Sequence, residues 1–315
     1  MSSKAKAKKV VAVIGYGSQG RAAALNLRDS GFPVTVGLRA RSKSRRVALR
    51  DGLSPVTTVS RAVAEADIVM LAFPDHQHCR VFSRDIADNL RPGATLVFLH
   101  GLSVHFKLVT PPDHCDVILI APHAPGTAVR ERFLGERSVS AFYAILQNRS
   151  KRARTTIYEL AAGLGFKRKN LIRSTFAEEA IGDIFGEQAV LCGGLAQLIK
   201  NGFEVLVNHG WKPENAYLEI AYQLDLIVQL IKQHGIEGMF RRISVAARYG
   251  SYINGPKIVG KSSRAAMEKA FARISSGTFV RDLAGLSDDD IERLNSQLGE
   301  LSHPEFEKAA RRFRK

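Results

Sequence analysis

Cysteine is scarce in this chain, with three among 315 residues. Cys79, Cys115 and Cys192 do not have the spacing of metal ligands. This usage argues against a disulfide-rich secreted domain and is typical of a protein in a reducing cytoplasm. Cys192 stands in an apolar run, so we expect it to be a buried small apolar residue.

Long apolar runs are also missing. No run approaches the roughly 20 residues that a helix needs to span a bilayer. Residues 1–9 are basic, but the apolar run after them is too short for a signal peptide. With 45% hydrophobic residues over 315 positions, the chain is predicted to be a globular, cytoplasmic protein of two modest domains behind a flexible leader at 1–9.

Acidic residues are the minority among the charges. Thirty Asp and Glu stand against 46 Lys and Arg, which gives a formal net charge of +16. A surplus of this size can indicate nucleic-acid binding, but the basic residues are spread out and no nucleic-acid motif accompanies them. We therefore expect neither a nucleic-acid nor a membrane partner and interpret the charge as suited to small anionic ligands.

The most informative stretch is residues 10–20, an apolar run followed at once by glycines. Gly15, Gly17 and Gly20 have the spacing GxGxxG, and a helix is predicted after them. A strand, a tight turn and a helix N-terminus together make a cradle for a dinucleotide pyrophosphate. The candidate cofactor-binding residues here are Gly15, Tyr16, Gly17, Ser18, Gln19 and Gly20.

Apolar runs and helical patterns alternate through the first half of the chain. The runs predicted as strands after the first are 33–38, 67–72, 94–99, 116–121 and 139–146. Near-continuous apolar strands separated by helices predict an α/β fold with a doubly wound parallel sheet. Helical patterns dominate after about residue 175, so we predict a Rossmann-type domain over 10–174 and an all-helical domain over 175–315.

An acidic residue is missing where a site for NAD usually has one, about 20 residues past the glycines. The second predicted strand is followed instead by a basic loop at 39–46, and the first acid after it is Asp51. Arg39, Ser42 and Ser44 could bind a 2′-phosphate through charge-assisted hydrogen bonds. The sequence therefore favours NADPH over NADH.

Further motifs follow in a fixed order after the glycine turn and the basic loop. They are His100-Gly101, Pro125-Gly126, and the block Asp183-Ile-Phe-Gly-Glu-Gln188. Together these motifs resemble the short form of ketol-acid reductoisomerase, from about Val10 to the His303-Pro304 tail. The resemblance implies a knotted helical C-terminal domain and a homodimer with a shared active site.

The same resemblance implies an activity. Members of the family use NADPH and Mg²⁺ to migrate an alkyl group of 2-acetolactate-like 2-hydroxy-3-keto acids and to reduce the product. The resulting 2,3-dihydroxy acids serve branched-chain amino-acid biosynthesis. Pro74, Asp75 and Gly126 match cofactor-binding positions, and His100 matches the histidine beside the nicotinamide.

Two acids of the last motif can be interpreted physically. Asp183 and Glu187 are four residues apart, so on a helix both carboxylates project from one face, and magnesium prefers such oxygen ligands. By resemblance, Asp183 bridges two ions and Glu187 holds the first, which makes both catalytic alongside the histidine. The resemblance also assigns three residues of the C-terminal half, with Glu219 and a weakened Gln223 as ligands of the second ion and Ser244, with Glu219, as substrate-binding.

The chain departs from the family pattern at several positions. Gln223, Ile181 and Arg248 stand where the family has glutamates, and His123 and Ser103 replace a lysine and an asparagine. If these positions face one pocket, that pocket holds one Mg²⁺ readily and a second Mg²⁺ poorly. Two alternatives therefore stay open. One is a paralogue that only reduces a keto acid or a similar anion with NADPH, and the other is a non-catalytic NADPH-binding protein.

Overall fold

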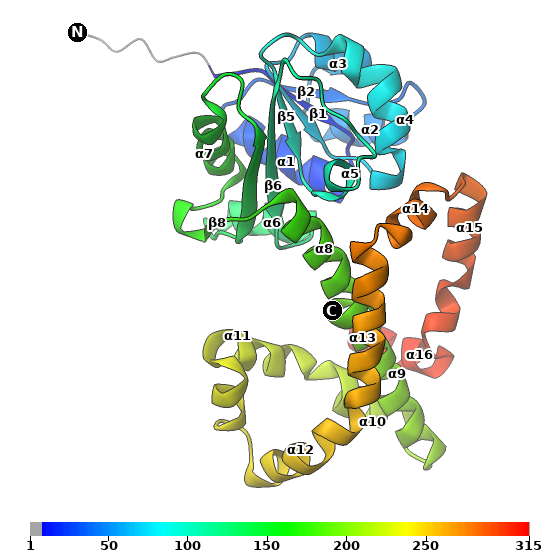
Figure 1. Ribbon diagram of the computed structural model, residues 1–315. Helices are drawn as coiled ribbons and strands as arrows, with labels where there is room; N and C mark the ends of the chain where they lie inside the picture. The colour runs from blue at the N-terminus through cyan, green and yellow to red at the C-terminus, as the bar shows by residue number, and fades with distance from the viewer. Residues whose placement is uncertain (1–7, 315) are drawn as a thin grey trace. The chain divides into compact units, whose positions relative to one another are not determined.

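The computed structural model describes residues 8–314, and the chain divides into two compact units, 1–182 and 183–315 (Figure 1). Apart from Lys8 and Lys9, the predicted leader lies outside the described residues. The division between the units falls within one helix, α8 (Phe176–Gly186).

Unit 1 contains an eight-stranded sheet with the order β3-β2-β1-β4-β5-β6-β7-β8. Neighbouring strands are parallel except β6 and β7, which are antiparallel. The strands are β1 (Val11–Ile14), β2 (Val34–Gly37), β3 (Val56–Thr57), β4 (Ile68–Leu71), β5 (Thr95–Phe98), β6 (Asp116–Pro122), β7 (Ala141–Gln147) and β8 (Leu171–Arg173). The predicted α/β fold is confirmed, but β3 and β8 were not predicted, because two or three residues carry too little apolar pattern.

Helices cover both faces of this sheet, which is why its strands are continuously apolar. They are α1 (Ser18–Asp29), α2 (Ser44–Arg50), α3 (Val59–Ala64), α4 (His78–Val81), α5 (Leu102–His105), α6 (Gly126–Leu134) and α7 (Ala153–Leu164). Val11 and Val13 enter one buried core with residues of α1, α6 and α7. Ala12 and Ile14 enter a second core with residues of α3 and of α8. Successive residues of β1 thus stabilise opposite layers.

The described part of the chain after Arg173 contains no strand, so the predicted all-helical half is confirmed. After α8 its helices are α9 (Gly193–Asn208), α10 (Pro213–Tyr217), α11 (Leu224–Phe240), α12 (Val245–Ile258), α13 (Lys261–Ser275), α14 (Thr278–Ala284), α15 (Asp288–Gln297) and α16 (Pro304–Phe313). Two π-helical turns, Glu187–Leu191 and Leu218–Tyr222, interrupt this series. Such turns often occur at functional sites.

One expectation about this half, the burial of Cys192, is wrong. Cys192 is exposed, because it follows a π-helical turn on a helix whose apolar side chains are largely uncovered in the single chain. The helical stretch Phe176–Asn208 is also long and apolar enough to cross a membrane by length and composition, although no continuous apolar run of that length exists. A single stretch of this kind is weak evidence for a membrane protein, and this one includes Asp183, Glu187 and Lys200.

Candidate active site

The three glycines after β1 have three different surroundings. Gly15 has a φ of +97°, and a Cβ there would lie 2.5 Å from the carbonyl oxygen of Ala72. A Cβ at Gly20 would lie 2.5 Å from the carbonyl oxygen of Gly15. At Gly17 nothing lies within 4 Å. Gly15 and Gly20 are therefore required by the protein itself, whereas Gly17 leaves open space in front of the N-terminus of α1, where a pyrophosphate can approach.

The neighbouring cradle residues hold this turn against the rest of unit 1. The side-chain amide of Gln19 donates to the carbonyl oxygen of Ala124 at 2.8 Å. A Cβ on Gly126 would lie 2.1 Å from the carbonyl oxygen of Ser18, so α6 begins in direct contact with the start of α1. The two loops after β1 and β6 thus meet at the carboxyl edge of the sheet.

Tyr16 is a structural residue of the cradle through its side chain. It is buried, and its hydroxyl donates to Asp51 at 2.8 Å. Arg21 donates two hydrogen bonds to the same carboxylate, at 2.7 and 2.9 Å. The hydrogen bonds from Arg21 lower the pKa of Asp51. The first acid after the basic loop is therefore already occupied by protein partners, which is the arrangement expected when no acid is reserved for a ribose 2′-hydroxyl.

The basic loop after β2 is only partly available to a ligand. Arg45 donates to the carbonyl oxygens of Val56 and Thr57, at 2.7 and 3.2 Å, so it fixes β3. Arg39 is exposed, and the half-buried Ser42 donates its backbone N–H to the carbonyl oxygen of Arg39 in a tight turn. Ser44, also half-buried, begins α2. A 2′-phosphate would thus meet Arg39 and the two serines.

Introducing acids at both serines tests this assignment. The Ser42→Asp/Ser44→Asp variant is expected to raise KM for NADPH by about tenfold or more, since each carboxylate would repel a 2′-phosphate. KM for NADH should change little. Initial rates with both cofactors measure the ratio, and Ser275→Asp on α13 is the matched control. An unchanged NADPH preference would contradict the placement of the phosphate here.

The loop after β4 carries Pro74 and Asp75, the other predicted cofactor residues. It is anchored by His78, which the sequence analysis did not single out. His78 is 4% exposed; one ring nitrogen, Nε2, lies 2.9 Å from the carbonyl oxygen of Phe73, and Nδ1 lies 2.7 Å from the hydroxyl of Ser103. A carbonyl only accepts, so Nε2 carries the proton and Nδ1 accepts from Ser103.

Burial lowers the pKa of His78, and nearby His100 and His76 lower it further, although Asp75 acts in the opposite direction. In the unfolded chain, His78 takes up a proton as the pH falls below about 6.5. In the folded protein its lowered pKa keeps it neutral to a lower pH, so protonation favours unfolding. Stability should therefore be complete above pH 6.5 and decline as the pH falls to 5. The urea concentration at the midpoint of unfolding, measured against pH, follows this decline. The midpoint should fall less steeply with pH in His78→Gln, whereas the exposed His114→Gln variant should show the wild-type dependence. Parallel slopes for all three proteins would rule out the burial effect.

His100 lies at the carboxyl end of β5 and is paired with an acid that the sequence analysis missed. Its Nδ1 lies 2.8 Å from Oε2 of Glu179, which is 5% exposed. The backbone N–H of Gly101 donates to the same carboxylate oxygen. A carboxylate only accepts, so Nδ1 of His100 donates and the neutral ring presents Nε2 as the nitrogen that can take up a proton.

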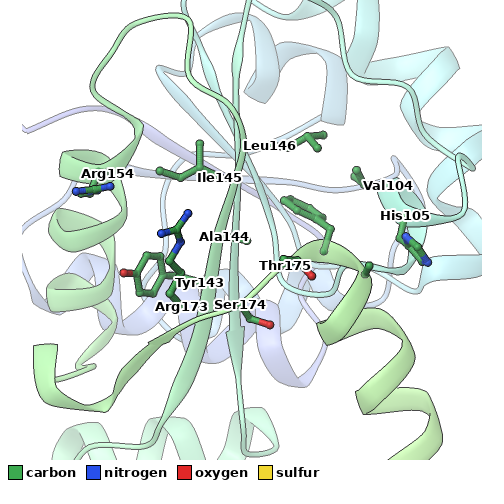
Figure 2. Close-up of a pocket in the computed structure, with 12 residues that line it drawn as sticks. Val104, His105, Tyr143, Ala144, Ile145, Leu146, Arg154, Arg173, Ser174 and Thr175 are labelled. Atoms are coloured by element: carbon green, nitrogen blue, oxygen red, sulfur yellow. The ribbon is translucent and has the colours of Figure 1, made fainter.

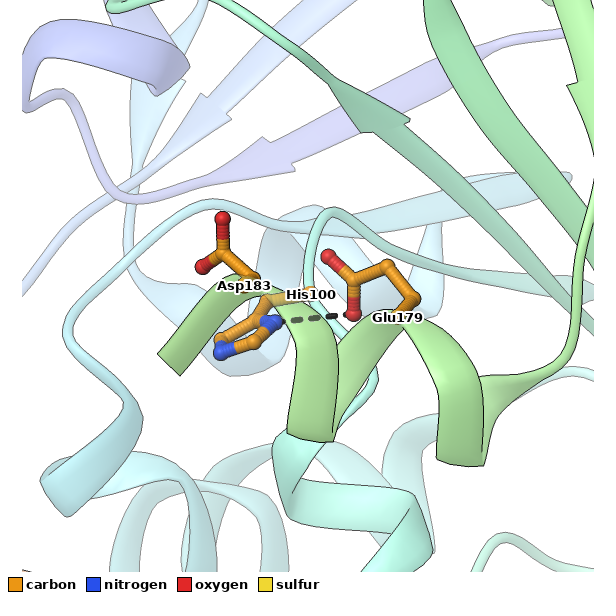
Figure 3. A group of neighbouring side chains, drawn as sticks. All are labelled: His100, Glu179 and Asp183. Atoms are coloured by element: carbon orange, nitrogen blue, oxygen red, sulfur yellow. Dashed lines mark hydrogen bonds and ion pairs between the residues drawn. The ribbon is translucent and has the colours of Figure 1, made fainter. Parts of the chain in front are cut away.

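Glu179 and Asp183 lie one turn apart on α8 (Figure 3). Ligand atoms of His100, Glu179 and Asp183 all lie within 4.8 Å of one another, and this is the one group of three His, Cys, Asp or Glu found among residues 8–314. The spacing Glu179, Asp183, Glu187 repeats every four residues, a signal that could have identified Glu179 from sequence.

The other predicted metal and substrate residues lie in unit 2. Glu187 begins a π-helical turn, and Glu219 lies in another. Gln223 donates its side-chain amide to Oε2 of Glu219 at 3.3 Å. Ser244 caps α12 by accepting the N–H of Ala247 at 3.1 Å, which leaves its hydroxyl proton able to donate to a carboxylate.

Three of the substituted positions make side-chain contacts within their own unit. Arg248 donates to the carbonyl oxygens of Phe240 and Ile243, so it fixes the turn before α12. His123 packs its ring edge-on against Phe142, with the centroids 4.3 Å apart. Gln223 alone among these three contacts a predicted metal ligand.

Both halves of the chain match known sequences. Residues 5–170 match the NADPH-binding domain of acetohydroxy acid isomeroreductase, and residues 176–315 match the C-terminal domain of ketol-acid reductoisomerase. The chain belongs to the ketol-acid reductoisomerase family. A ketol-acid reductoisomerase (NADP(+)) of Pyrobaculum calidifontis is 47% identical over 274 residues, which cover 87% of this chain and 83% of that protein. One from Xanthomonas axonopodis pv. citri is 44% identical, covering 93% and 88%.

Solved structures of the family agree with the fold. A structure described as an NADH-preferring ketol-acid reductoisomerase from an uncultured archean superposes with a TM-score of 0.91 at 35% identity, covering 96% of this chain and 93% of that one. Cofactor preference thus differs between such reductoisomerases. In this chain the engagement of Asp51 and the exposed Arg39 favour NADPH.

Proposed function

We propose that this chain is an NADPH-dependent ketol-acid reductoisomerase that converts 2-acetolactate-like 2-hydroxy-3-keto acids to 2,3-dihydroxy acids for branched-chain amino-acid biosynthesis. The observation that carries the proposal is the hydrogen-bonded His100–Glu179 pair next to Asp183, in a chain whose two halves match the two domains of the family. We further propose a cytoplasmic location, as expected for a biosynthetic enzyme.

The cofactor and the metal fit the residues present. The open space at Gly17 and the N-terminus of α1 suit a pyrophosphate, and exposed Asp183 and Glu187 offer the oxygens that Mg²⁺ prefers. When bound, NADPH supplies a hydride and Mg²⁺ acts as a Lewis acid toward the oxygens of the substrate. In this proposal Asp183 and Glu187 would hold one ion, and Glu219 with Gln223 would help to hold the second.

In this proposal, side chains of the protein bind the substrate and transfer a proton. Glu179 fixes the tautomer of His100, so that Nε2 can hold or release a proton at the reacting substrate. Ser244 donates its hydroxyl proton to the substrate carboxylate. Because helix α8 carries both Glu179 and Asp183, the proton-handling pair and the metal ligands are set at a fixed spacing.

We also propose that the active chain is a homodimer with a shared active site. Unit 2 exposes large apolar side chains that a second copy could cover, among them Leu191 at 66%, Val245 at 76% and Tyr252 at 82%. The family resemblance implies an active site that is shared across the dimer. A partner that supplied Glu219 would complete the metal site.

Two substrates test the proposed function. With NADPH and Mg²⁺, the protein should oxidise NADPH with 2-acetolactate and with a pre-isomerised 3-hydroxy-2-keto acid at comparable rates. The contact between Gln223 and Glu219 favours a second candidate, a paralogue that only reduces a keto acid. Turnover of the pre-isomerised substrate alone would establish that candidate, and NADPH binding without turnover of either substrate would overturn both.

Restoring an acid at position 223 tests the second metal site. Gln223→Glu removes an amide donor from Glu219 and adds a negative charge beside it. We expect Mg²⁺ to bind about tenfold more tightly, because a carboxylate is the stronger ligand for a hard cation. Calorimetric titration with MgCl₂ measures this, with exposed Gln297→Glu as control. Equal affinities in all three proteins would refute a weakened site at Gln223.

A further inference from the structure

We propose that unit 1 has a second small-molecule site, which binds an aliphatic carboxylate at strand β7, next to the edge strand β8. A cavity of about 470 Å³ lies across this strand (Figure 2). Its lining comes from α5, β7, α7, the end of β8 and the start of α8. It is separate from the glycine cradle and contains none of the residues proposed above for the cofactor, the metal or the substrate. Its volume lies within the usual range of small-molecule sites.

One end of the cavity is cationic. Arg154 of α7 and Arg173 of β8 lie on the same side of β7 as Tyr143 (Figure 2). In the part of the chain that the structure describes, neither arginine side chain has a hydrogen bond or a carboxylate within 4.0 Å. The rings of Tyr143 and Tyr158 meet edge-to-face with their centroids 6.1 Å apart. The side chain of Tyr158 raises the pKa of Tyr143, and the positive charges of both arginines lower it. Two guanidinium groups and no carboxylate therefore line this end of the cavity.

A third arginine, Arg168, adds positive charge near this end of the cavity without lining it. Arg168 stacks on the ring of Tyr158 with its guanidinium carbon 4.5 Å from the ring centroid. Glu178, in the first turn of α8, is exposed and accepts a hydrogen bond from Ser174 at 3.1 Å. An unpaired arginine pair beside a tyrosine hydroxyl suits a planar carboxylate, since a guanidinium group can bond it through two nitrogens.

The rest of the lining is mainly apolar. The larger apolar side chains are Val104, Ile145, Leu146 and Phe176, and Leu146 is 50% exposed. Ala144 and Ala177 add smaller apolar groups, and His105, Ser174 and Thr175 are the polar members. A free inorganic anion would leave the apolar side chains in contact with water, whereas a branched aliphatic chain would cover them. The ligand that suits both ends of the cavity is therefore a carboxylate with an aliphatic chain. Such a ligand would touch α5, which directly follows His100-Gly101, and the start of α8, which leads to Glu179.

The probe for the test is 4-methylpentanoate, and its neutral amide serves as the uncharged comparison. Methyl resonances of Val104, Ile145 and Leu146 in the full-length protein, saturated with NADPH and Mg²⁺, report on the cavity itself. We expect saturable shifts with the carboxylate, at least tenfold weaker binding of the amide, and a similar loss in Arg154→Gln/Arg173→Gln. Arg149→Gln, an exposed arginine paired with Asp113 outside the cavity, should bind like the wild type.

Three results would overturn the proposal: no saturable shifts at these methyl groups, equal binding of the amide, or unchanged binding in the double arginine variant. Inorganic phosphate that binds as tightly as the carboxylate would also overturn it, since the apolar lining would then contribute nothing. The readout does not depend on turnover. Failure here therefore leaves the reductoisomerase proposal intact, and failure of that proposal leaves this one.

Discussion

Glu179→Gln is expected to lower kcat by about 100-fold or more while KM for NADPH changes little. The variant keeps the shape of the side chain, but it removes the charge that pairs with His100 and it can present an N–H where Nδ1 of His100 now donates. The neutral ring would then favour the tautomer with its proton on Nε2. In that tautomer Nε2 cannot take up a proton from the substrate. Losses of this size are typical when a positioned acid–base group loses its orientation.

Glu178→Gln is the matched control for this experiment. Glu178 precedes Glu179 on the same helix, but it is exposed; its carboxylate accepts a hydrogen bond from Ser174 and its backbone N–H donates to Thr175. Its replacement should leave kcat within about twofold of wild type, as surface changes usually do. The pH profile of kcat in Glu179→Gln should also shift, because the acid that stabilises protonated His100 is gone. A variant with wild-type kcat and an unchanged profile would remove Glu179 from the active site.

Alanine at two glycines of the cradle should separate folding from cofactor binding. Gly15→Ala forces a side chain into positive φ and brings its Cβ 2.5 Å from the carbonyl oxygen of Ala72. We expect it to lose about 2 kcal/mol or more of unfolding free energy. Gly17→Ala meets no atom within 4 Å, so the variant should keep its stability. Its methyl group would instead occupy the space of the approaching pyrophosphate and weaken NADPH binding by about tenfold or more.

Urea denaturation and NADPH titration, each on both variants, measure these effects. Gly93→Ala separates the two causes at Gly15, because Gly93 has a φ of +77° but no atom within 4 Å of an added Cβ. Its stability loss should reflect strain alone and be smaller than that of Gly15→Ala. Wild-type NADPH affinity in Gly17→Ala would show that the dinucleotide does not approach the backbone there.

Local patterns in the sequence were enough to predict the α/β sheet of unit 1. Apolar runs such as 67–72 and 116–121 coincide closely with β4 and β6, since both faces of these strands are buried. The antiparallel direction of β7 could not be predicted, because an apolar run carries no information about its neighbour. The exposure of Cys192 could not be predicted either, because an apolar helix pattern does not show whether another part of the same chain covers the helix.

The candidate site shows the same limit. Sequence spacing placed Asp183 and Glu187 on one helix face and placed the glycines at a strand end. It did not identify Glu179, whose importance arises from its distance of 2.8 Å to His100, 79 residues away. It also could not show that Arg248 bonds the backbone carbonyl of Phe240 or that His123 packs against Phe142.

The sequence by itself determined the family, the dinucleotide cradle and the preference for NADPH, because each depends on residues that are close together in the chain. Only the tertiary structure decided which side chains are already occupied by the protein. Asp51 is bound by Tyr16 and Arg21, whereas Arg154 and Arg173 face a cavity without an acid. The physical reason is that a charged side chain is available to a ligand only if folding has not brought it a partner, and those partners come from distant positions in the chain.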